Sequence, residues 1–383
     1  MTAASTSTRT TAPRIAAIDA LRGLVMLLML VDHVRETFFL HAQVRDPMDL
    51  AVTAPNLVAT RLTSHLCAPV FLLLTGLSAC LYAGKHGTGA ASRFLLTRGL
   101  FLIGLELTLV NLAWTGKILP PVLYLQVIWA IGLSMVALAG LLRLPRPALA
   151  AVALVIMLGH NLLDGIVLAP GQAGYVPWSI LHQRGLIDLP WGVARTSYPV
   201  LPWIGVAAAG YALGPWFALD PLARQRRLLA LGAAALAGFL VLRGLDGYGE
   251  PVPWQAGPTI GATVLSFLNL TKYPPSACFL LLTLGLGLWL LALFEALPAA
   301  RLAWLRVFGG APLFFYVVHL WLLRGLYHLA LVLGFAGPSG RVEAGSPAQL
   351  WLIAAFLSLP LYGACRWMVG LKRQGRHPVL SYL

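Results

Sequence analysis

One apolar stretch near the start of the chain carries four residues that could do chemistry together. Residues 16–40 are hydrophobic enough to enter a bilayer, yet they include Arg22 and the cluster Asp32, His33 and Arg35. Ten residues separate Arg22 from His33, about three helical turns and about 16 Å of rise, so both side chains fall on roughly the same face. An imidazole can take and return a proton near neutral pH. The spacing therefore predicts a path from a cation near one surface to a buried reaction point.

Other histidines and acids also enter apolar stretches of the chain. Charged and titratable side chains inside such stretches are costly and usually functional. Together they predict a buried polar chamber that opens toward the outer face; the set is His33, His65, His160, His319 and His328, with Asp32, Asp164, Arg35 and Glu106. A snorkelling arginine and satisfied core histidines remain an alternative explanation of the same residues.

The composition excludes a soluble globular protein. Of the 383 residues, 59% are hydrophobic and 10% are charged, whereas soluble domains carry about 25% charged residues. Segments of about 20 apolar residues predict an all-α polytopic membrane protein with about ten spans and both termini cytoplasmic. The predicted spans are 16–40, 62–83, 94–116, 120–142, 147–166, 197–219, 227–244, 275–297, 307–334 and 349–370.

The charge distribution supports this membrane topology. The net charge of +14 gathers in the segments that the ten spans place on the cytoplasmic side, as the positive-inside rule requires. The excess of positive charge therefore indicates the membrane topology, and we expect no nucleic-acid partner. Residues 1–13 are predicted to be a disordered cytoplasmic tail, 14–371 a transmembrane domain and 372–383 a basic cytoplasmic tail.

Several common catalytic and binding motifs are missing from the sequence. The four cysteines lie in apolar stretches without metal-like or disulfide-like spacing, so we expect small buried hydrophobes. No His-x-x-x-His pair at ligand spacing is present, and we expect no metal. Gly-x-Ser-x-Gly, phosphate-loop and dinucleotide fingerprints are also absent.

Three segments of the chain carry a family resemblance. Arg22 and His33 on the first span resemble the signature of the acyltransferase type 3 family. Ile18-Asp19-Ala-Leu-Arg22-Gly23-Leu, Cys67-Ala-Pro69-Val-Phe and Pro312-Leu-Phe-Phe-Tyr316-x-x-His319 resemble bacterial relatives of heparan-α-glucosaminide N-acetyltransferase. The resemblance implies an enzyme of the bacterial inner membrane that moves an acyl group, typically acetyl from coenzyme A, to an acceptor across the bilayer.

The resemblance also implies roles for individual residues. His33 would be the general base or a transient acyl carrier, and Arg22 would contact the donor. Lysosomal relatives place their histidine in the loop after the first helix, where His41 is the nearest counterpart. We expect catalytic roles for His33, Asp32, Arg35 and His65, contacts to acetyl-coenzyme A from Arg22, Lys85, Arg93, Arg98, Tyr316 and His319, and contacts to the acceptor from His41, Asp46, His160, Asp164, Lys272 and Tyr273.

Two other functions fit the same residues. A proton-coupled transporter or lipid flippase would use the buried His, Asp and Glu groups as a relay, but matched halves with broken helices are not evident. A membrane scaffold with polar contacts between helices is the third interpretation. The acceptor stays open among a hexosamine, a hydroxyl of a cell-envelope polysaccharide and a lipid headgroup, as does the oligomeric state.

Overall fold

The computed structural model describes residues 15–39 and 53–374, and most of this part of the chain is helical. Seven of its helical segments are long and apolar enough to cross a bilayer. They are α2, η2 and α3 (Pro55–Thr63, Ser64–Leu66, Cys67–His86); α4, η3 and α5 (Thr88–Leu105, Glu106–Val110, Asn111–Thr115); α7 and η4 (Arg146–Gly159, His160–Leu163); α10 (Pro221–Leu245); α12 (Ala277–Ala296); α14 (Pro312–Val332); and α15 (Pro347–Gln374). The expected helical membrane bundle is thus confirmed.

Three further helices match the remaining predicted spans. They are α1 (Ala16–Phe38), α6 (Val127–Leu141) and α9 (Leu201–Leu213), which continues into η5 (Gly214–Ala218). Helix α1 is long enough to cross but is rich in charge, while α6 and α9 are short. The count of ten spans and the side of the termini stay predictions. The tail predicted at 1–13 lies outside the described residues, and α15 runs into the tail predicted from residue 372.

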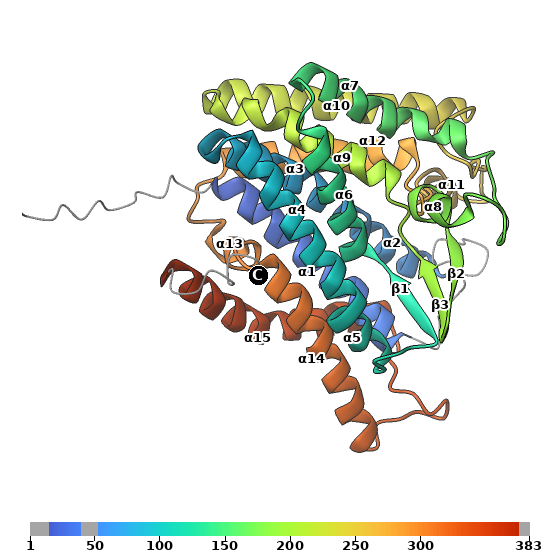
Figure 1. Ribbon diagram of the computed structural model, residues 1–383. Coiled ribbons are helices and arrows are strands. Elements are labelled where there is room, and N and C mark those ends of the chain that lie inside the picture. Colours follow the sequence, from blue (N-terminus) through green and yellow to red (C-terminus); the bar gives the residue numbers. More distant parts are fainter. Residues whose placement is uncertain (1–14, 40–52, 375–383) are drawn as a thin grey trace, which may run out of the picture.

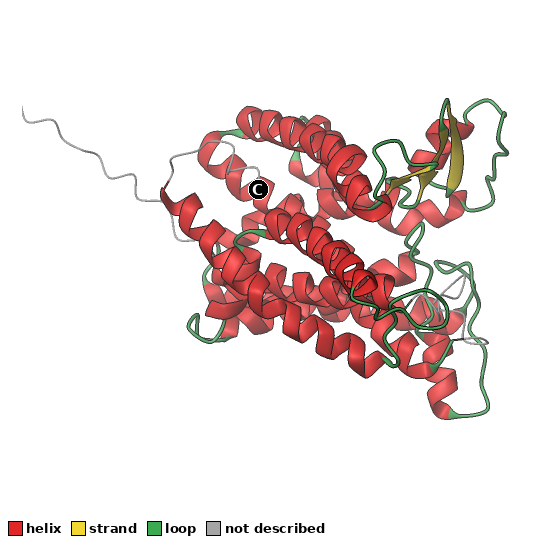
Figure 2. Ribbon diagram, turned by 90° about the horizontal axis from the view of Figure 1, so that it is seen from below, coloured by secondary structure: helices red, strands yellow, loops and turns green. Residues whose placement is uncertain are grey.

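Helix α1 lies in the middle of the bundle and organises it. It contacts α3, α12, α13 (Ala303–Gly309), α14 and α15. The start of α1 and the end of α15 lie at one end of the molecule, whereas the sheet lies at the other (Figures 1 and 2). We call these the terminal end and the sheet end. The short helices α8 (Tyr175–Leu181) and α11 (Ile260–Phe267) also lie at the sheet end (Figure 1).

The sheet end holds a small β-sheet that the sequence analysis missed. Strands β1 (Val122–Leu125), β3 (Gly192–Thr196) and β2 (Gly185–Leu189) pair in that order, β1 parallel and β2 antiparallel to β3. The span predicted from residue 120 was therefore wrong at its start, because its helix begins only at Val127. Pro120 and Pro121 lack N–H donors, and the branched and aromatic residues that follow favour a strand.

Small residues let the helices approach closely. A Cβ added at Gly76 of α3 would lie 1.8 Å from the carbonyl oxygen of Ala207, and one at Gly210 of α9 would lie 2.0 Å from that of Leu73. Without a hydrophobic force between helices in lipid, such backbone contacts supply much of the packing energy. All four cysteines are free and buried, as the sequence predicted.

Replacing Gly76 with alanine is expected to destabilise the bundle by about 1–3 kcal/mol, because the backbones of α3 and α9 must separate. Thermal unfolding in detergent measures the change. Gly84→Ala on the same helix is the matched control, since nothing lies within 4 Å of its added Cβ. Equal unfolding temperatures for the two variants would contradict the packing assigned to this crossing.

Candidate active site

A cavity of about 630 Å³ opens between helices at the terminal end of the bundle. Helices α1, α3, α4, α6 and α14 supply most of its wall, and Gly309, Gly310 and Lys372 complete it. Its charged side chains are mainly cationic: Arg22, Lys85, Arg98 and Lys372, and His86 also lines it. Among the described residues of the wall, Asp19 is the one carboxylate. We call this the cationic cavity. Its electrostatic character suits a bound polyanion.

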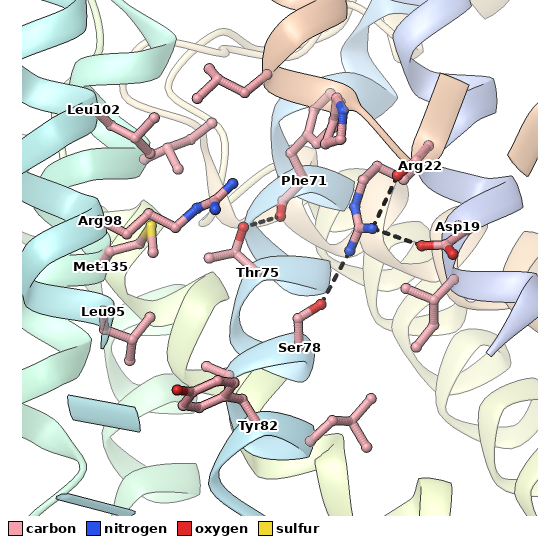
Figure 3. Close-up of a pocket in the computed structure, with 18 of the residues that line it drawn as sticks. Asp19, Arg22, Phe71, Thr75, Ser78, Tyr82, Leu95, Arg98, Leu102 and Met135 are labelled. Atoms are coloured by element: carbon pink, nitrogen blue, oxygen red, sulfur yellow. Dashed lines mark hydrogen bonds and ion pairs between the residues drawn. The ribbon is translucent and has the colours of Figure 1, made fainter. Parts of the chain in front are cut away.

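Two arginines face one another across the cationic cavity (Figure 3). Within the part of the chain that the structure describes, Arg22 of α1 donates hydrogen bonds to three groups. Its guanidinium donates to the Asp19 carboxylate at 3.0 Å, to the Ser78 hydroxyl at 3.1 Å and to the Gly309 carbonyl at 3.3 Å. Arg98 reaches in from α4 on the opposite wall (Figure 3). Planar guanidinium groups match the geometry of phosphate oxygens well.

The cavity follows α1 into the bundle. Ile15 lines it near the terminal end and Met29 lines it deeper, about 21 Å further along the helix axis. Tyr316 of α14 also lines the wall, and its ring meets that of His33 edge to face at 6.0 Å between centroids. His33 itself lies one helical turn beyond Met29. The imidazole is thus placed just past the deep part of the cavity.

His33 is paired with a second histidine from α14. Its Nδ1 lies 2.6 Å from His319 Nε2, and His319 Nδ1 lies 2.8 Å from the carbonyl oxygen of Phe315. A carbonyl only accepts, so His319 Nδ1 carries the hydrogen and its Nε2 offers a lone pair when neutral. His33 must then donate from Nδ1. The pattern leaves His33 Nε2 as the unprotonated nitrogen, which is the atom a general base needs.

An ionic cluster lies on the sheet-end side of His33. Asp32 accepts a hydrogen bond from Arg35 Nε at 3.1 Å and another from Arg61 Nη1. Arg61 also donates to the Tyr273 hydroxyl at 3.4 Å, which lies 3.0 Å from that of Tyr198. Two arginines therefore hold the Asp32 carboxylate. The His33 ring is oriented by His319 of α14 and not by Asp32.

Tyr273 joins this cluster from the loop before α12. Burial alone would raise the pKa of its phenol, but Lys272 and Arg61 beside it and the hydrogen bond with Tyr198 hold that pKa below its ordinary value. Lys272 Nζ lies 5.5 Å from the centre of the Tyr273 ring. The predicted acceptor contacts Lys272 and Tyr273 are thus near the catalytic candidates Asp32 and Arg35.

The other predicted site residues have different surroundings. Arg93 is exposed and does not line the cationic cavity. His65 is buried against Phe279, with 5.1 Å between ring centroids, and it lies close enough to Lys272, Arg61 and Asp32 to interact with them electrostatically. His41 and Asp46 lie outside the described residues.

The remaining histidines do not form one chamber with His33. His160 packs against His182, whose Nε2 lies 3.0 Å from Asp164. These contacts join the end of η4 to the end of α8. His328 of α14 is exposed. The single polar chamber expected from the sequence was therefore wrong for His160, Asp164 and His328, whereas His319, Asp32 and Arg35 do lie around His33. Contacts between segments that are distant in sequence decide where each of these histidines lies, and a sequence pattern does not show such contacts.

Several site residues were not identified from the sequence. Arg61 was visible at the start of the second span but had no role assigned, because its partner Asp32 lies in another helix. Ser78, Tyr198 and Lys372 likewise acquire roles only through tertiary contacts. Within the described ranges no three His, Cys, Asp or Glu side chains gather as a metal-binding group.

Comparison with known proteins identifies one family. A family model described as "Heparan-alpha-glucosaminide N-acetyltransferase, catalytic" matches residues 14–245, more than half of the chain. The matched region includes Arg22, His33, Arg61 and Arg98, whereas Tyr316 and His319 follow it. No curated protein matches the chain.

Proposed function

The chain belongs to the heparan-alpha-glucosaminide N-acetyltransferase catalytic family of membrane acetyltransferases, and on this premise we propose that it transfers acetyl from coenzyme A to a sugar or cell-envelope acceptor. The acceptor would supply a hydroxyl or an amine at the outer face. We also propose a location in the bacterial inner membrane, with ten crossings and the terminal end of the bundle on the cytoplasmic side.

The observation that carries the proposal is the cationic cavity leading toward His33. Coenzyme A is a polyanion with phosphates at one end and an uncharged arm that ends in the thioester. Lys85, Lys372 and Arg98 provide positive charge for the phosphates. The cavity volume lies within the range of about 300–1,000 Å³ that is usual for ligand pockets. The uncharged arm of coenzyme A would then lie against Met29 and Tyr316 in the deep part of the cavity.

The proposed reaction is direct transfer with His33 as the base. His33 Nε2 takes the proton of the acceptor O–H or N–H while the acceptor atom attacks the thioester carbonyl carbon. The C–S bond then breaks, and the leaving thiolate receives the proton from the His33 imidazolium. His319 is a positioning residue, because it holds the His33 ring and fixes its tautomer.

Tyr316 is placed to stabilise the negative charge that develops on the thioester oxygen. Its hydroxyl is buried beside the Trp114 indole, and neither group has a hydrogen bond to a third group in the described part of the chain. The phenol therefore keeps a hydrogen available for a ligand. Because Tyr316 both lines the cationic cavity and contacts His33, it would reach the carbonyl where the acceptor attacks.

Replacing Tyr316 with phenylalanine is expected to lower kcat by about 10²–10³-fold, the usual effect of losing one oxyanion donor. The affinity for coenzyme A itself should stay the same, because only the hydroxyl is removed. Steady-state kinetics and donor binding by calorimetry measure the two quantities. A rate equal to that of the wild type would exclude Tyr316 from this role.

Labelled acetyl-coenzyme A tests the proposed function as a whole. Purified protein in sealed vesicles is given acetyl-labelled donor on one side and candidate amines and hydroxyls on the other. We expect label on the acceptor only when donor meets the terminal end and acceptor meets the sheet end. Movement of an acceptor across the vesicle without acetylation or donor binding would instead support the transporter alternative.

A further inference from the structure

The deep part of the cationic cavity is lined by apolar side chains and one tyrosine. Four helices supply them: Met29 of α1, Leu102 of α4, Val127 and Ile128 of α6, and Tyr316 of α14. Apolar groups of a ligand are favoured against such a lining, because contact with it removes them from water. The proposed function places the acyl end of the donor here.

Trp114 of α5 lies behind this deep part. Its ring meets the His33 ring edge to face, with 5.2 Å between centroids. Its indole Nε1 is buried beside the Tyr316 hydroxyl. Tyr316 lines the cavity, whereas His33 and Trp114 do not. The indole therefore fills the space next to the two side chains that would meet the thioester.

A π-helical turn directs Trp114 to this place. Residues Glu106–Val110, between α4 and α5, form a π-helix, and such a turn adds one residue to an α-helix. Trp114 follows Leu102 by 12 residues, so in an unbroken α-helix the two side chains would point about 120° apart. The added residue corresponds to about 100° of rotation and brings the two directions to within about 20°. Trp114 is thereby turned to the side of the helix that lines the cationic cavity.

The backbone that carries Trp114 is fixed at both ends of α5. The Asn111 side chain bonds the N–H and the carbonyl of Tyr124 in β1, each at 2.8 Å. Near the other end of α5, Arg324 of α14 donates to the Ala113 carbonyl at 3.0 Å. A side chain on a backbone held in this way can define the size of a pocket closely.

We propose that Trp114 limits the length of the acyl group that the donor can carry. The inference rests on the proposed acetyltransferase function and adds a specificity-determining residue to it. An acetyl group has a single methyl beyond the thioester carbonyl, whereas butyryl and hexanoyl groups have longer chains. With the carbonyl beside Tyr316 and His33, a longer chain would need the space that the Trp114 indole fills.

Binding of acyl-coenzyme A donors to the full-length protein in detergent tests the proposal without an acceptor. Acetyl-, butyryl- and hexanoyl-coenzyme A are titrated separately by calorimetry. We expect the wild-type protein to bind hexanoyl-coenzyme A about tenfold or more weakly than acetyl-coenzyme A, because a closed apolar pocket discriminates by about 10–200-fold per methylene. Equal or tighter binding of hexanoyl-coenzyme A would overturn the role of Trp114, and this outcome needs no variant to fold.

Trp114→Ala is expected to raise the affinity for hexanoyl-coenzyme A about tenfold or more relative to that for acetyl-coenzyme A. Trp114→Phe keeps an aromatic ring and should give an intermediate ratio. Trp304→Ala is the matched control, because it removes an exposed tryptophan from α13 and should leave the ratio of the wild type. General damage to the fold would weaken all donors together and could not reverse their order.

A Trp114→Ala protein that binds acetyl-coenzyme A and keeps the wild-type preference would overturn the proposal. Length-dependent binding that Trp114→Ala removes, without acyl transfer to any acceptor, would support the role of Trp114 and count against the proposed reaction. The two failures are therefore distinguishable.

Discussion

Replacing His33 with glutamine is expected to lower the rate of acetyl transfer by about 10²–10⁴-fold, the contribution of a well-placed general base. His33 is buried, and its Nδ1 is engaged with His319, so only Nε2 is available to take the acceptor proton. Glutamine retains hydrogen-bonding capacity but cannot accept this proton near neutral pH. Single-turnover transfer from labelled donor measures the rate.

Donor affinity separates this loss from damage to the fold. His33 lies beyond the cationic cavity and is not among its lining residues, so the Kd for acetyl-coenzyme A should be unchanged. His328→Gln is the matched control, because it alters an exposed histidine on α14. A His33→Gln protein that turns over at the wild-type rate would eliminate His33 as the base.

Replacing His319 with phenylalanine is expected to reduce kcat by about 10²-fold or more while the KM values for donor and acceptor stay near those of the wild type. The imidazole of His319 links the Phe315 carbonyl to His33 Nδ1 and so fixes which His33 nitrogen is basic. Loss of an orienting partner in comparable catalytic arrangements costs up to about 10⁴-fold. Steady-state kinetics over a range of pH measures the effect.

A conservative variant distinguishes this orienting role from simple packing. The side-chain oxygen of glutamine can accept the His33 Nδ1 hydrogen, so His319→Gln should recover part of the rate that His319→Phe loses. The pH–rate profile should also return toward that of the wild type. Equal rates for the Gln and Phe variants would show that His319 acts only by filling space.

Part of this site was predictable because it lies on one helix. The ten-residue spacing of Arg22 and His33 on α1 indicated a cation near the surface and a deeper imidazole, and the structure places Arg22 in the cationic cavity and His33 just beyond it. Tyr316 and His319, both expected from the resemblance to contact the donor, are three residues apart on α14 and so point the same way. In the structure the rings of both residues contact the His33 ring.

The rest depends on contacts between distant segments. The Asp32 ion pair with Arg61 and the pairing of β1 with β3 join residues that no local pattern connects. Strand β1 was taken as helix because four residues between a proline pair and a long apolar run give too short a signal. The separate placement of His160 and His328 has the same origin.

A structure of the protein with a non-reactive acetyl-coenzyme A analogue would show whether the cationic cavity delivers the thioester to His33. We expect phosphates against Lys85, Arg98 and Lys372 in the cationic cavity, with the acyl end beside Tyr316 and within reach of His33 Nε2. An analogue bound at another place, or bound with its acyl end directed away from His33, would contradict this expectation.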